Sequence, residues 1–349
     1  MDSYNIKKYL NDYSQKIQPL LRTYLINKIK EAKKIGDIPV KFLESFSQMV
    51  VRGKNVRGAL VVLGYQLAGG KDMASIYDAS TFIEILHSGA LIHDDVMDKD
   101  DIRRGLPTIH KQFENYGKGN GKSFAICAGD IAFYLAWDKL LNSNFSNDKL
   151  IKAGKIFVKY ALNVVYGQAL DLINNVGNNF NQQAILNVFR FKTAEYTGVL
   201  PLLIGAILGG IEDEKKLGIL MEFGLDLGWA FQIRDDILGL YGNEEKIGKP
   251  VGSDLREGKK TLFIYYILKN GNDMQKKFVL SVLGNKNISG NEISKVQKLF
   301  KEIGAYNYVM QLGWDYVKKG KETIPLITAN KKLQILLASL IKYIMERTR

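Results

Sequence analysis

Two groups of aspartates stand at the ends of apolar stretches of helical spacing. The first, Asp94–Asp98, carries aspartates at 94, 95 and 98 and follows the apolar run 82–92. Carboxylates four positions apart share one helix face, so Asp94 and Asp98 should lie side by side, with Asp95 rotated away by about 100°. Close like charges need a counter-cation, and Mg²⁺ suits because it takes one or two carboxylates and completes its shell with water and phosphate oxygens. Taken alone, the group fits an exposed acidic helix end equally well.

The second group, Asp235 and Asp236, ends the apolar segment 223–233. If the two acidic helix ends face each other across a bundle, their carboxylates can hold several Mg²⁺ ions against a single diphosphate. This facing arrangement is the expectation on which the functional interpretation rests.

Basic residues provide the complementary charge for a diphosphate. They stand in expected loops or near helix ends, where backbone N–H groups can also contact phosphate. These residues are Lys54, Arg57, Arg103, Arg104, Lys192, Lys249 and Lys259. Each one, taken singly, is more simply explained as an exposed surface charge. Their number and their position relative to the aspartates favour an anion site.

The three histidines, His87, His93 and His110, all fall near the first acidic group. A zinc site is disfavoured, because the chain has one distant cysteine and its histidines do not form a His-x-x-x-His pair. His87 is better suited to donate a hydrogen bond to a diphosphate, while His93 is as compatible with a structural role as with a functional one.

Long segments with apolar residues at helical spacing must position these groups. The expected helices are 4–29, 59–67, 75–98, 124–141, 151–173, 184–208, 217–240, 261–268, 292–304, 306–319 and 331–347. Strand-like alternation is not apparent, which predicts an all-α class. The polar interruption 241–260 has the length and composition of a lid or ligand-binding element. Without a repeat or a linker to divide the chain, residues 1–349 are expected to form one domain.

Composition and charge narrow the classes of partner. The net charge of +13 allows an anionic partner, but the lysines are scattered and the chain lacks a nucleic-acid-binding motif, so nucleic acid is disfavoured. The longest apolar run, 199–211, is shorter than the about 20 residues that span a bilayer, and it predicts a buried helix. The single Cys127 fits a reducing compartment, so a cytoplasmic protein is expected, with this side chain buried.

Taken in order, these motifs resemble those of the trans-isoprenyl diphosphate synthase (polyprenyl synthetase) family. The resemblance spans roughly residues 53–260 and rests on seven elements in family order. They are Gly53-Lys54-x-x-Arg57, Asp94-Asp95-x-x-Asp98, Arg103-Arg104-Gly105, Gly167-Gln168-x-x-Asp171, Lys192-Thr193, Phe231-Gln232-x-x-Asp235-Asp236 and Gly248-Lys249-Pro250. The family fold that it implies is an antiparallel helix bundle around a deep central cavity.

The resemblance also implies a role for each matched residue. Asp94, Asp98 and Asp235 would ligate about three Mg²⁺ ions, with Asp95 and Asp236 in support. Lys54, Arg57, His87 and Arg104 would bind isopentenyl diphosphate. Arg103, Lys192, Lys249 and Lys259 would bind the allylic diphosphate (dimethylallyl, geranyl or farnesyl). Lys192, Thr193, Gln168, Tyr196 and Gln232 would line the centre where the carbon–carbon bond forms.

One position departs from the family pattern. The second acidic motif often has a third aspartate four residues after its first, and this chain has Gly239 there. Asp236 or Asp254 is a candidate to compensate. Because the first motif and every basic partner are present, the departure is interpreted as variation within the family.

Product length in this family depends on side chains beside the first acidic motif. The small residues Ala90 and Gly89 leave space for a growing chain, and Leu86 and Phe82 could form the floor of the tunnel. Each isoprenyl unit adds about five carbons of apolar burial, favourable by about 0.8 kcal/mol per CH₂. These features predict a C20 product or a longer one of C25 to C30, and they predict that Gly89→Phe shortens it.

Two rival functions share parts of this pattern. A class I terpene cyclase also uses helical aspartates and Mg²⁺, but it does not need a second diphosphate site. A non-catalytic regulatory subunit of a prenyl synthase would be expected to lose aspartates of the first motif, which this chain keeps. The resemblance further implies a homodimer, and release of an apolar product suggests peripheral membrane contact.

Overall fold

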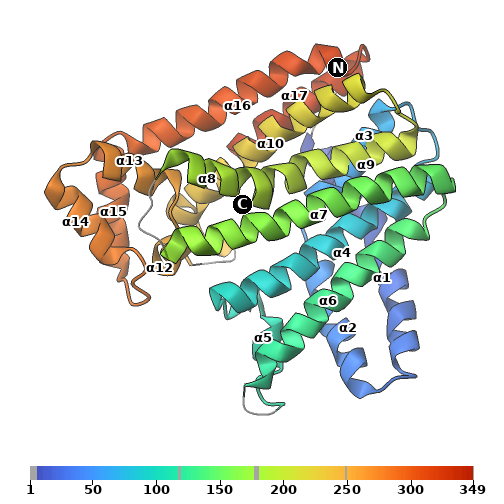
Figure 1. The fold of residues 1–349 in the computed structure, drawn as a ribbon, viewed down its shortest axis with the longest axis horizontal. Coiled ribbons are helices and arrows are strands. Elements are labelled where there is room, and N and C mark those ends of the chain that lie inside the picture. The colour runs from blue at the N-terminus through green and yellow to red at the C-terminus, as the bar shows by residue number, and fades with distance from the viewer. Residues whose placement is uncertain (1–5, 117–118, 177–180, 248–249, 349) are drawn as a thin grey trace. The chain divides into compact units, whose positions relative to one another are not determined.

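A computed structural model describes residues 6–116, 119–176, 181–247 and 250–348 (Figure 1). In chain order the elements are α1 (Ile6–Ala32), α2 (Asp37–Val50), α3 (Val56–Leu67), α4 (Met73–Asp98), β1 (Ile102–Arg103), β2 (Leu106–Pro107), α5 (Ile109–Gln112), α6 (Asn120–Leu141), α7 (Asn147–Val176), α8 (Gln182–Val188), the π-helix η1 (Phe189–Val199), α9 (Leu200–Gly209), α10 (Glu214–Tyr241), α11 (Glu244–Ile247), α12 (Ser253–Glu257), α13 (Leu262–Asn270), α14 (Asp273–Val282), α15 (Gly290–Glu302), α16 (Ala305–Ile327) and α17 (Lys331–Glu346). The predicted all-α class is confirmed.

Backbone packing groups the chain into two compact units. Unit 1 comprises residues 1–155 and 201–213, and unit 2 comprises residues 156–200 and 214–349. Each unit is described by itself below. The expectation of a single domain stays a prediction.

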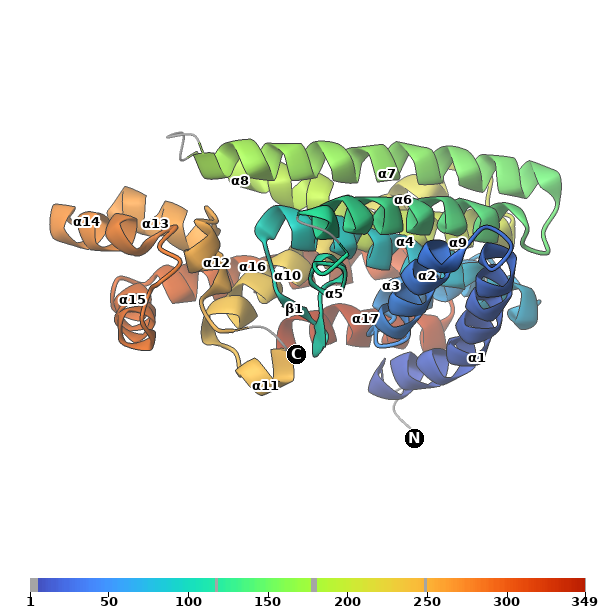
Figure 2. The ribbon, with the colours of Figure 1, turned by 90° about the horizontal axis from the view of Figure 1, so that it is seen from below.

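In unit 1, α4 packs along α6 and also contacts α1, α2 and α3 (Figure 2). Its middle turns are buried on several sides, with Phe82, Ile83 and Ile85 all fully enclosed. The Tyr13 hydroxyl of α1 lies 2.8 Å from the Ser80 hydroxyl of α4, which gives the buried phenol a polar partner. The helix α4, which carries the first acidic group at its C-terminal end, is therefore anchored along most of its length.

In unit 2, α10 packs against η1, α16 and α17. The contact with η1 is close because glycines face each other: a Cβ on Gly224 would lie 2.9 Å from the backbone of Gly198. Side chains on either glycine would separate the two helices. The short helices α13, α14 and α15 lie together in the same unit (Figure 2).

The structure differs from the sequence expectations in local detail. The segment expected as one helix over 184–208 contains the π-helical stretch η1 between α8 and α9. A helix, α2, was not anticipated; it begins with Asp37 and carries Pro39 in its first turn, where the missing N–H costs little. The interruption 241–260 contains the short helices α11 and α12.

The exposure of side chains tests two further expectations, a buried apolar run and a buried cysteine. The apolar run around α9 is buried as predicted, with Leu200, Leu202 and Ile204 fully enclosed. Two helical stretches, 182–209 and 147–175, reach membrane-spanning length and hydropathy; in the apolar 18-residue window of the first, 83% is buried, and in that of the second, 17%. The prediction that Cys127 is buried was wrong, because it lies on the exposed side of α6 beside Ile126.

Candidate active site

The acidic end of α4 is neutralised by an arginine close in sequence. Arg103 Nε donates to Asp95 Oδ1 at 2.6 Å, and its Nη2 lies 2.9 Å from Asp100 Oδ2 and 3.4 Å from Asp94 Oδ2. Asp95 is 1% exposed, and burial raises its pKa to about 6 despite the opposing effect of Arg103. α4 remains helical through Asp98, which keeps the first and last carboxylates of the motif on one face. The expected counter-cation is thus partly supplied by the protein.

A two-residue hairpin turn presents the neighbouring arginines. β1 and β2 pair antiparallel, and Arg104 and Gly105 between them both have positive φ, 54° and 73°. Such a turn joins strands tightly and separates adjacent side chains. Arg103 reaches the aspartates, whereas Arg104 Nη1 donates to Met49 O at 2.7 Å.

Arg57, Arg104 and His87 are all half-buried and form a basic cluster in unit 1. Burial lowers the pKa of His87 well below its usual value, and the charges of Arg57, Arg104 and Arg103 lower it further. Burial also lowers the pKa of Arg104 to about 10. A neutral His87 can donate one hydrogen bond beside these cations, so the cluster has the chemistry of a diphosphate site. Lys54 precedes it on an exposed turn.

Glu84 lies close to Arg57 and Arg104 of this cluster and was not singled out from the sequence. It is 3% exposed, and its Oε1 accepts the Gly58 N–H of α3 at 2.7 Å. Burial raises the pKa of Glu84, opposed by the Gly58 hydrogen bond and by Arg57 and Arg104. The carboxylate therefore ties the first turn of α3 to α4. The only sign of this role in the sequence was the position of Glu84 three residues before His87.

Position 89 faces another helix. A Cβ on Gly89 would lie 2.7 Å from the Ala132 Cβ and 3.2 Å from the Gly129 carbonyl oxygen, both on α6. Phenylalanine at Gly89 would collide with α6, so shortening by Gly89→Phe cannot report on a tunnel. Of the other expected lining residues, Phe82 and Leu86 are buried and Ala90 is half-buried.

In unit 2, side chains from η1 and α10 form a hydrogen-bonded chain. Thr193 Oγ1 donates to Gln232 Oε1 at 2.6 Å, and Gln232 Nε2 donates to Asp236 Oδ1 at 2.7 Å. Tyr196 is buried in the same π-helix, at 4% exposure. Local π-helical geometry often occurs at functional sites because it re-aims side chains relative to an α-helix. Gln168 lies on α7 in the same unit, partly buried.

The expected cations of unit 2 already contact carboxylates. Lys192 Nζ lies 2.6 Å from Asp171 Oδ2, so the two matched motifs that contain these residues meet in space. Lys259 Nζ lies 2.5 Å from Glu257 Oε2 and 3.8 Å from Asp254 Oδ1. Lys249 lies outside the described residues.

Asp235 has a partner from the far end of the chain. Arg347 Nη2 donates to Asp235 Oδ1 at 2.5 Å, and its guanidinium lies 4.1 Å from the centre of the Phe231 ring. The Arg347 carbonyl oxygen in turn accepts from Arg234. The Arg347 side chain is 5% exposed and the Asp235 side chain 43%. Sequence analysis missed Arg347, which lies beyond the matched motifs.

Two carboxylate oxygens among these residues are suited to Mg²⁺. Asp236 Oδ2 and Asp95 Oδ2 are both buried, and neither has a hydrogen-bond partner among the described residues. Buried carboxylate oxygens left in this state favour a hard cation. Within the described part of the chain, however, His, Cys, Asp and Glu do not gather in threes closely enough to hold a metal ion.

The structure therefore brings the predicted residues together in two separate sets. Unit 1 contains the first acidic motif and the residues expected to bind isopentenyl diphosphate. Unit 2 contains the second acidic motif, the η1 residues and Lys259. The expected facing of the two acidic helix ends stays a prediction.

Comparisons with known proteins identify relatives along nearly the whole chain. A family model described as polyprenyl synthetase matches residues 40–303. A geranylgeranyl diphosphate synthase of Sulfolobus acidocaldarius is 32% identical over 342 residues, which cover 97% of each chain. A geranylfarnesyl diphosphate synthase of Aeropyrum pernix is 32% identical over 306 residues, covering 85% of this chain and 91% of the relative.

A solved structure agrees with these relatives. The geranylgeranyl pyrophosphate synthase of Corynebacterium glutamicum, solved with isoprenyl diphosphate and magnesium, matches with a TM-score of 0.91 at 29% identity, covering 97% of this chain and 99% of that one. The chain belongs to the polyprenyl synthetase family of chain-elongating trans-prenyltransferases.

Proposed function

We propose that this chain condenses isopentenyl diphosphate with an allylic diphosphate, giving an all-trans polyprenyl diphosphate and releasing pyrophosphate. The observation that carries the proposal is the half-buried basic cluster of Arg57, Arg104 and His87 in the same unit as the acidic end of α4. Its charge suits a diphosphate distinct from the one bound through magnesium. A cyclase with a single diphosphate substrate does not need this second anion site.

The proposed roles follow the matched motifs. Asp94, Asp98 and Asp235 hold the Mg²⁺ ions, three in number, with Asp95 and Asp236 in support. Isopentenyl diphosphate is bound by Lys54, Arg57, His87 and Arg104, and the allylic diphosphate by Arg103, Lys192, Lys249 and Lys259. Bound Mg²⁺ supplies positive charge to the departing pyrophosphate.

The chain's own residues then serve the two halves of the reaction. The allylic C–O bond breaks and leaves a carbocation and pyrophosphate, so cations such as Lys192 contribute by stabilising negative charge as it develops. The hydroxyl of Thr193 and the amide of Gln232 offer dipoles to the cation. The double bond of isopentenyl diphosphate attacks, and one proton leaves, with pyrophosphate as the available base.

The deciding experiment is a product assay on the purified chain with Mg²⁺. The expected result is elongation with isopentenyl diphosphate plus dimethylallyl, geranyl or farnesyl diphosphate. Turnover of an allylic diphosphate alone, into a cyclic product, would support the cyclase instead. A chain that is inactive by itself, but stimulates an active synthase, would support the regulatory-subunit alternative.

For product length we propose C20, with C25 to C30 as the alternative. Support comes from the small Ala90 and from the buried Leu86 and Phe82 further along α4. The position to test is Ala90, since a side chain at Gly89 meets α6. Ala90→Phe should shorten the product by one isoprenyl unit or more, as read by chromatography, whereas Ala90→Ser should leave it unchanged. Unchanged length in Ala90→Phe would move the tunnel elsewhere.

We propose that the partner protein is a second copy of this chain, in the cytoplasm. On α7, Val158, Leu162, Val165, Tyr166 and Ile173 are exposed at helical spacing. Such a stripe is typical of a helix that packs on a partner, and a two-fold axis would set it against itself. Light scattering should report a dimer, and Leu162→Glu with Val165→Glu should yield a monomer. Flotation with anionic vesicles tests the alternative of membrane contact.

A further inference from the structure

The second acidic motif has Gly239 where a third carboxylate is often found. The side chain of Asp254, on α12, fills the space beside this glycine. A Cβ on Gly239 would lie 2.9 Å from Asp254 Oδ2, closer than side chains approach in practice. The Asp254 carboxylate therefore occupies the volume that a side chain at 239 would need. Glycine at this position and aspartate at 254 fit each other sterically.

The loop after α10 fixes Asp254 in this place. The Gly252 N–H donates to the Gly239 carbonyl at 2.9 Å, which ties the loop to the last turns of α10. Gly252 has a φ of 79°, and α12 begins directly after it. The Lys259 N–H donates to the Asp254 carbonyl at 2.9 Å, closing the other side. The backbone around Asp254 is thus held by hydrogen bonds on both sides.

Asp236 provides a second, independent indication of a ligand here. It is 6% exposed, and its Oδ1 accepts from Gln232 at 2.7 Å. Its Oδ2 is buried and has no hydrogen-bond partner among the described residues. Asp236 precedes Gly239 by three residues on α10, so the two positions lie on the same helix face, against which the Asp254 carboxylate packs.

The lysine beside this pair of carboxylates, Lys259, also contacts a third carboxylate. Lys259 Nζ lies 3.8 Å from Asp254 Oδ1 but 2.5 Å from Glu257 Oε2, so its closest contact is with another carboxylate. Two neighbouring carboxylates with an unsatisfied buried oxygen match the preference of Mg²⁺ for one or two carboxylates plus water and phosphate oxygens.

We propose that Asp254 supplies the carboxylate that position 239 lacks, and that Asp254 and Asp236 form an additional oxygen-ligand pair for a divalent cation at the second acidic motif. The inference rests on the proposed function, because the cation is the Mg²⁺ that accompanies a diphosphate. It assigns a ligand-binding role to a residue outside the aspartate motifs.

The test measures Mg²⁺ binding without turnover. Thermal unfolding is followed while Mg²⁺ is titrated against a fixed excess of inorganic pyrophosphate, and the Mg²⁺ concentration for half-maximal stabilisation is recorded. Asp254→Asn should raise this concentration about tenfold, the usual effect of losing a group that supports a metal site. Asp254→Ala should raise it likewise, and Gly239→Asp in the Asp254→Ala background should return it to within about twofold of the parent, because alanine at 254 leaves room for a carboxylate at 239.

Controls separate this inference from the proposed function. Asp315→Asn, on α16, alters a carboxylate that contacts Gln311 and should leave the titration unchanged. Gly239→Ala should weaken Mg²⁺ binding without changing charge, since its methyl group displaces Asp254. If Asp235→Asn shifts the titration and Asp254→Asn does not, the inference is overturned and the proposed function stands. If the parent protein shows no stabilisation by Mg²⁺ with pyrophosphate, the proposed function itself is overturned.

Discussion

Asp95 and Asp235 each pair with an arginine, yet the two arginines come from very different places in the chain. Arg103 follows Asp95 by eight residues, on the hairpin next to α4. Arg347 follows Asp235 by 112 residues, after the last helix. The first pair is almost fully enclosed, whereas Asp235 keeps 43% of its side-chain exposure. A local segment therefore builds the first acidic region, and tertiary packing builds the second.

The difference bears on how each region can respond to a bound cation. Asp95 is enclosed with its arginine, so its charge is balanced within a rigid network. Asp235 can exchange its arginine for solvent or a metal ion, because part of its surface is open. We expect the first region to be costly to disturb and the second to be adjustable.

The largest expected effect is on activity. Asp94→Asn should lower kcat/KM about 10³-fold, since it removes a charge proposed to hold Mg²⁺ against the leaving group. Asp235→Asn should cost about 10²-fold, because Asp236 and Asp254 remain near the second motif. The measurement is steady-state incorporation of labelled isopentenyl diphosphate at saturating Mg²⁺. Equal losses in the two variants would contradict the proposed difference between the regions.

Next in size is the stability effect of Arg103→Met. The change leaves the enclosed Asp95 without its cation, and breaking a buried pair in this way costs about 3 kcal/mol or more in free energy of unfolding. Because burial already raises the folded pKa of Asp95 to about 6, protonation relieves the cost in acid. Urea unfolding should show a large loss at pH 8 and a smaller one at pH 5. A loss independent of pH would argue against Asp95 as its origin.

Arg347→Met should have a smaller effect on stability. Asp235 can be solvated when its partner is gone, so the expected loss is about 1 kcal/mol, including the contact with Phe231. The same variant should bind Mg²⁺ with pyrophosphate more tightly, as the competing cation is absent. Unfolding and Mg²⁺ titration read out both effects, with Arg347→Lys as the control that keeps the charge. A greater loss than that of Arg103→Met would reverse the comparison.

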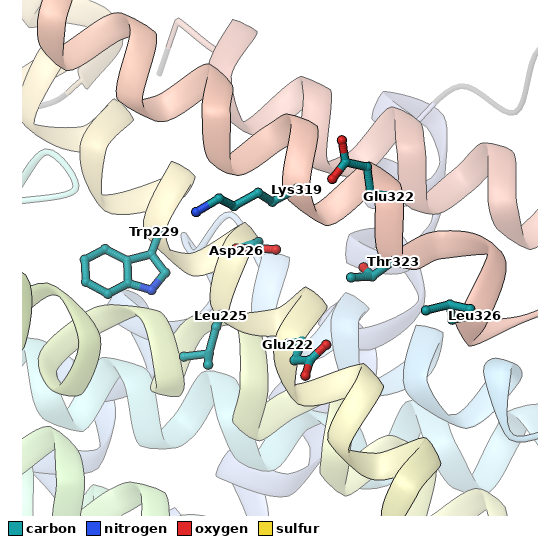
Figure 3. A pocket seen from close by; sticks show the side chains of 8 residues that line it. All are labelled: Glu222, Leu225, Asp226, Trp229, Lys319, Glu322, Thr323 and Leu326. Carbon is teal, nitrogen blue, oxygen red and sulfur yellow. The ribbon is translucent and has the colours of Figure 1, made fainter.

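The smallest effect is expected at Asp226, a carboxylate of α10 two to three turns before Asp235. It lines a surface cavity of about 520 Å³ with Glu222, Glu322 and Lys319 (Figure 3). Burial raises its pKa to about 6, and Glu222 and Glu322 add to the shift while Lys319 opposes it. A raised folded pKa means that stability falls as pH rises through about 6.

Asp226→Asn removes that penalty, so the variant should be more stable by less than about 1 kcal/mol at pH 8. The gain should vanish at pH 4, where Asp226 is protonated in the folded protein. Thermal unfolding at the two pH values measures the difference. A stabilisation at pH 4 as large as that at pH 8 would exclude the pKa shift as its cause.

Local patterns in the sequence were enough to predict the helical class and to identify the ordered motifs. Helical spacing is a local property, repeated every three to four residues, and it identified α4 and α10 together with the acidic groups that they carry. The seven motifs in order were sufficient to identify the family, which the matching model over residues 40–303 confirmed.

Contacts between different elements could not be predicted in this way. Arg347 contacts Asp235, Asp254 fills the space beside Gly239, and Glu84 contacts the first turn of α3. Position 89 meets α6. Each of these contacts joins residues on different elements. The π-helical turn at Lys192 and Thr193 likewise depends on packing against α10. Such contacts depend on how helices pack, and the periodicity of one helix carries no information about which side chain of another will lie against it.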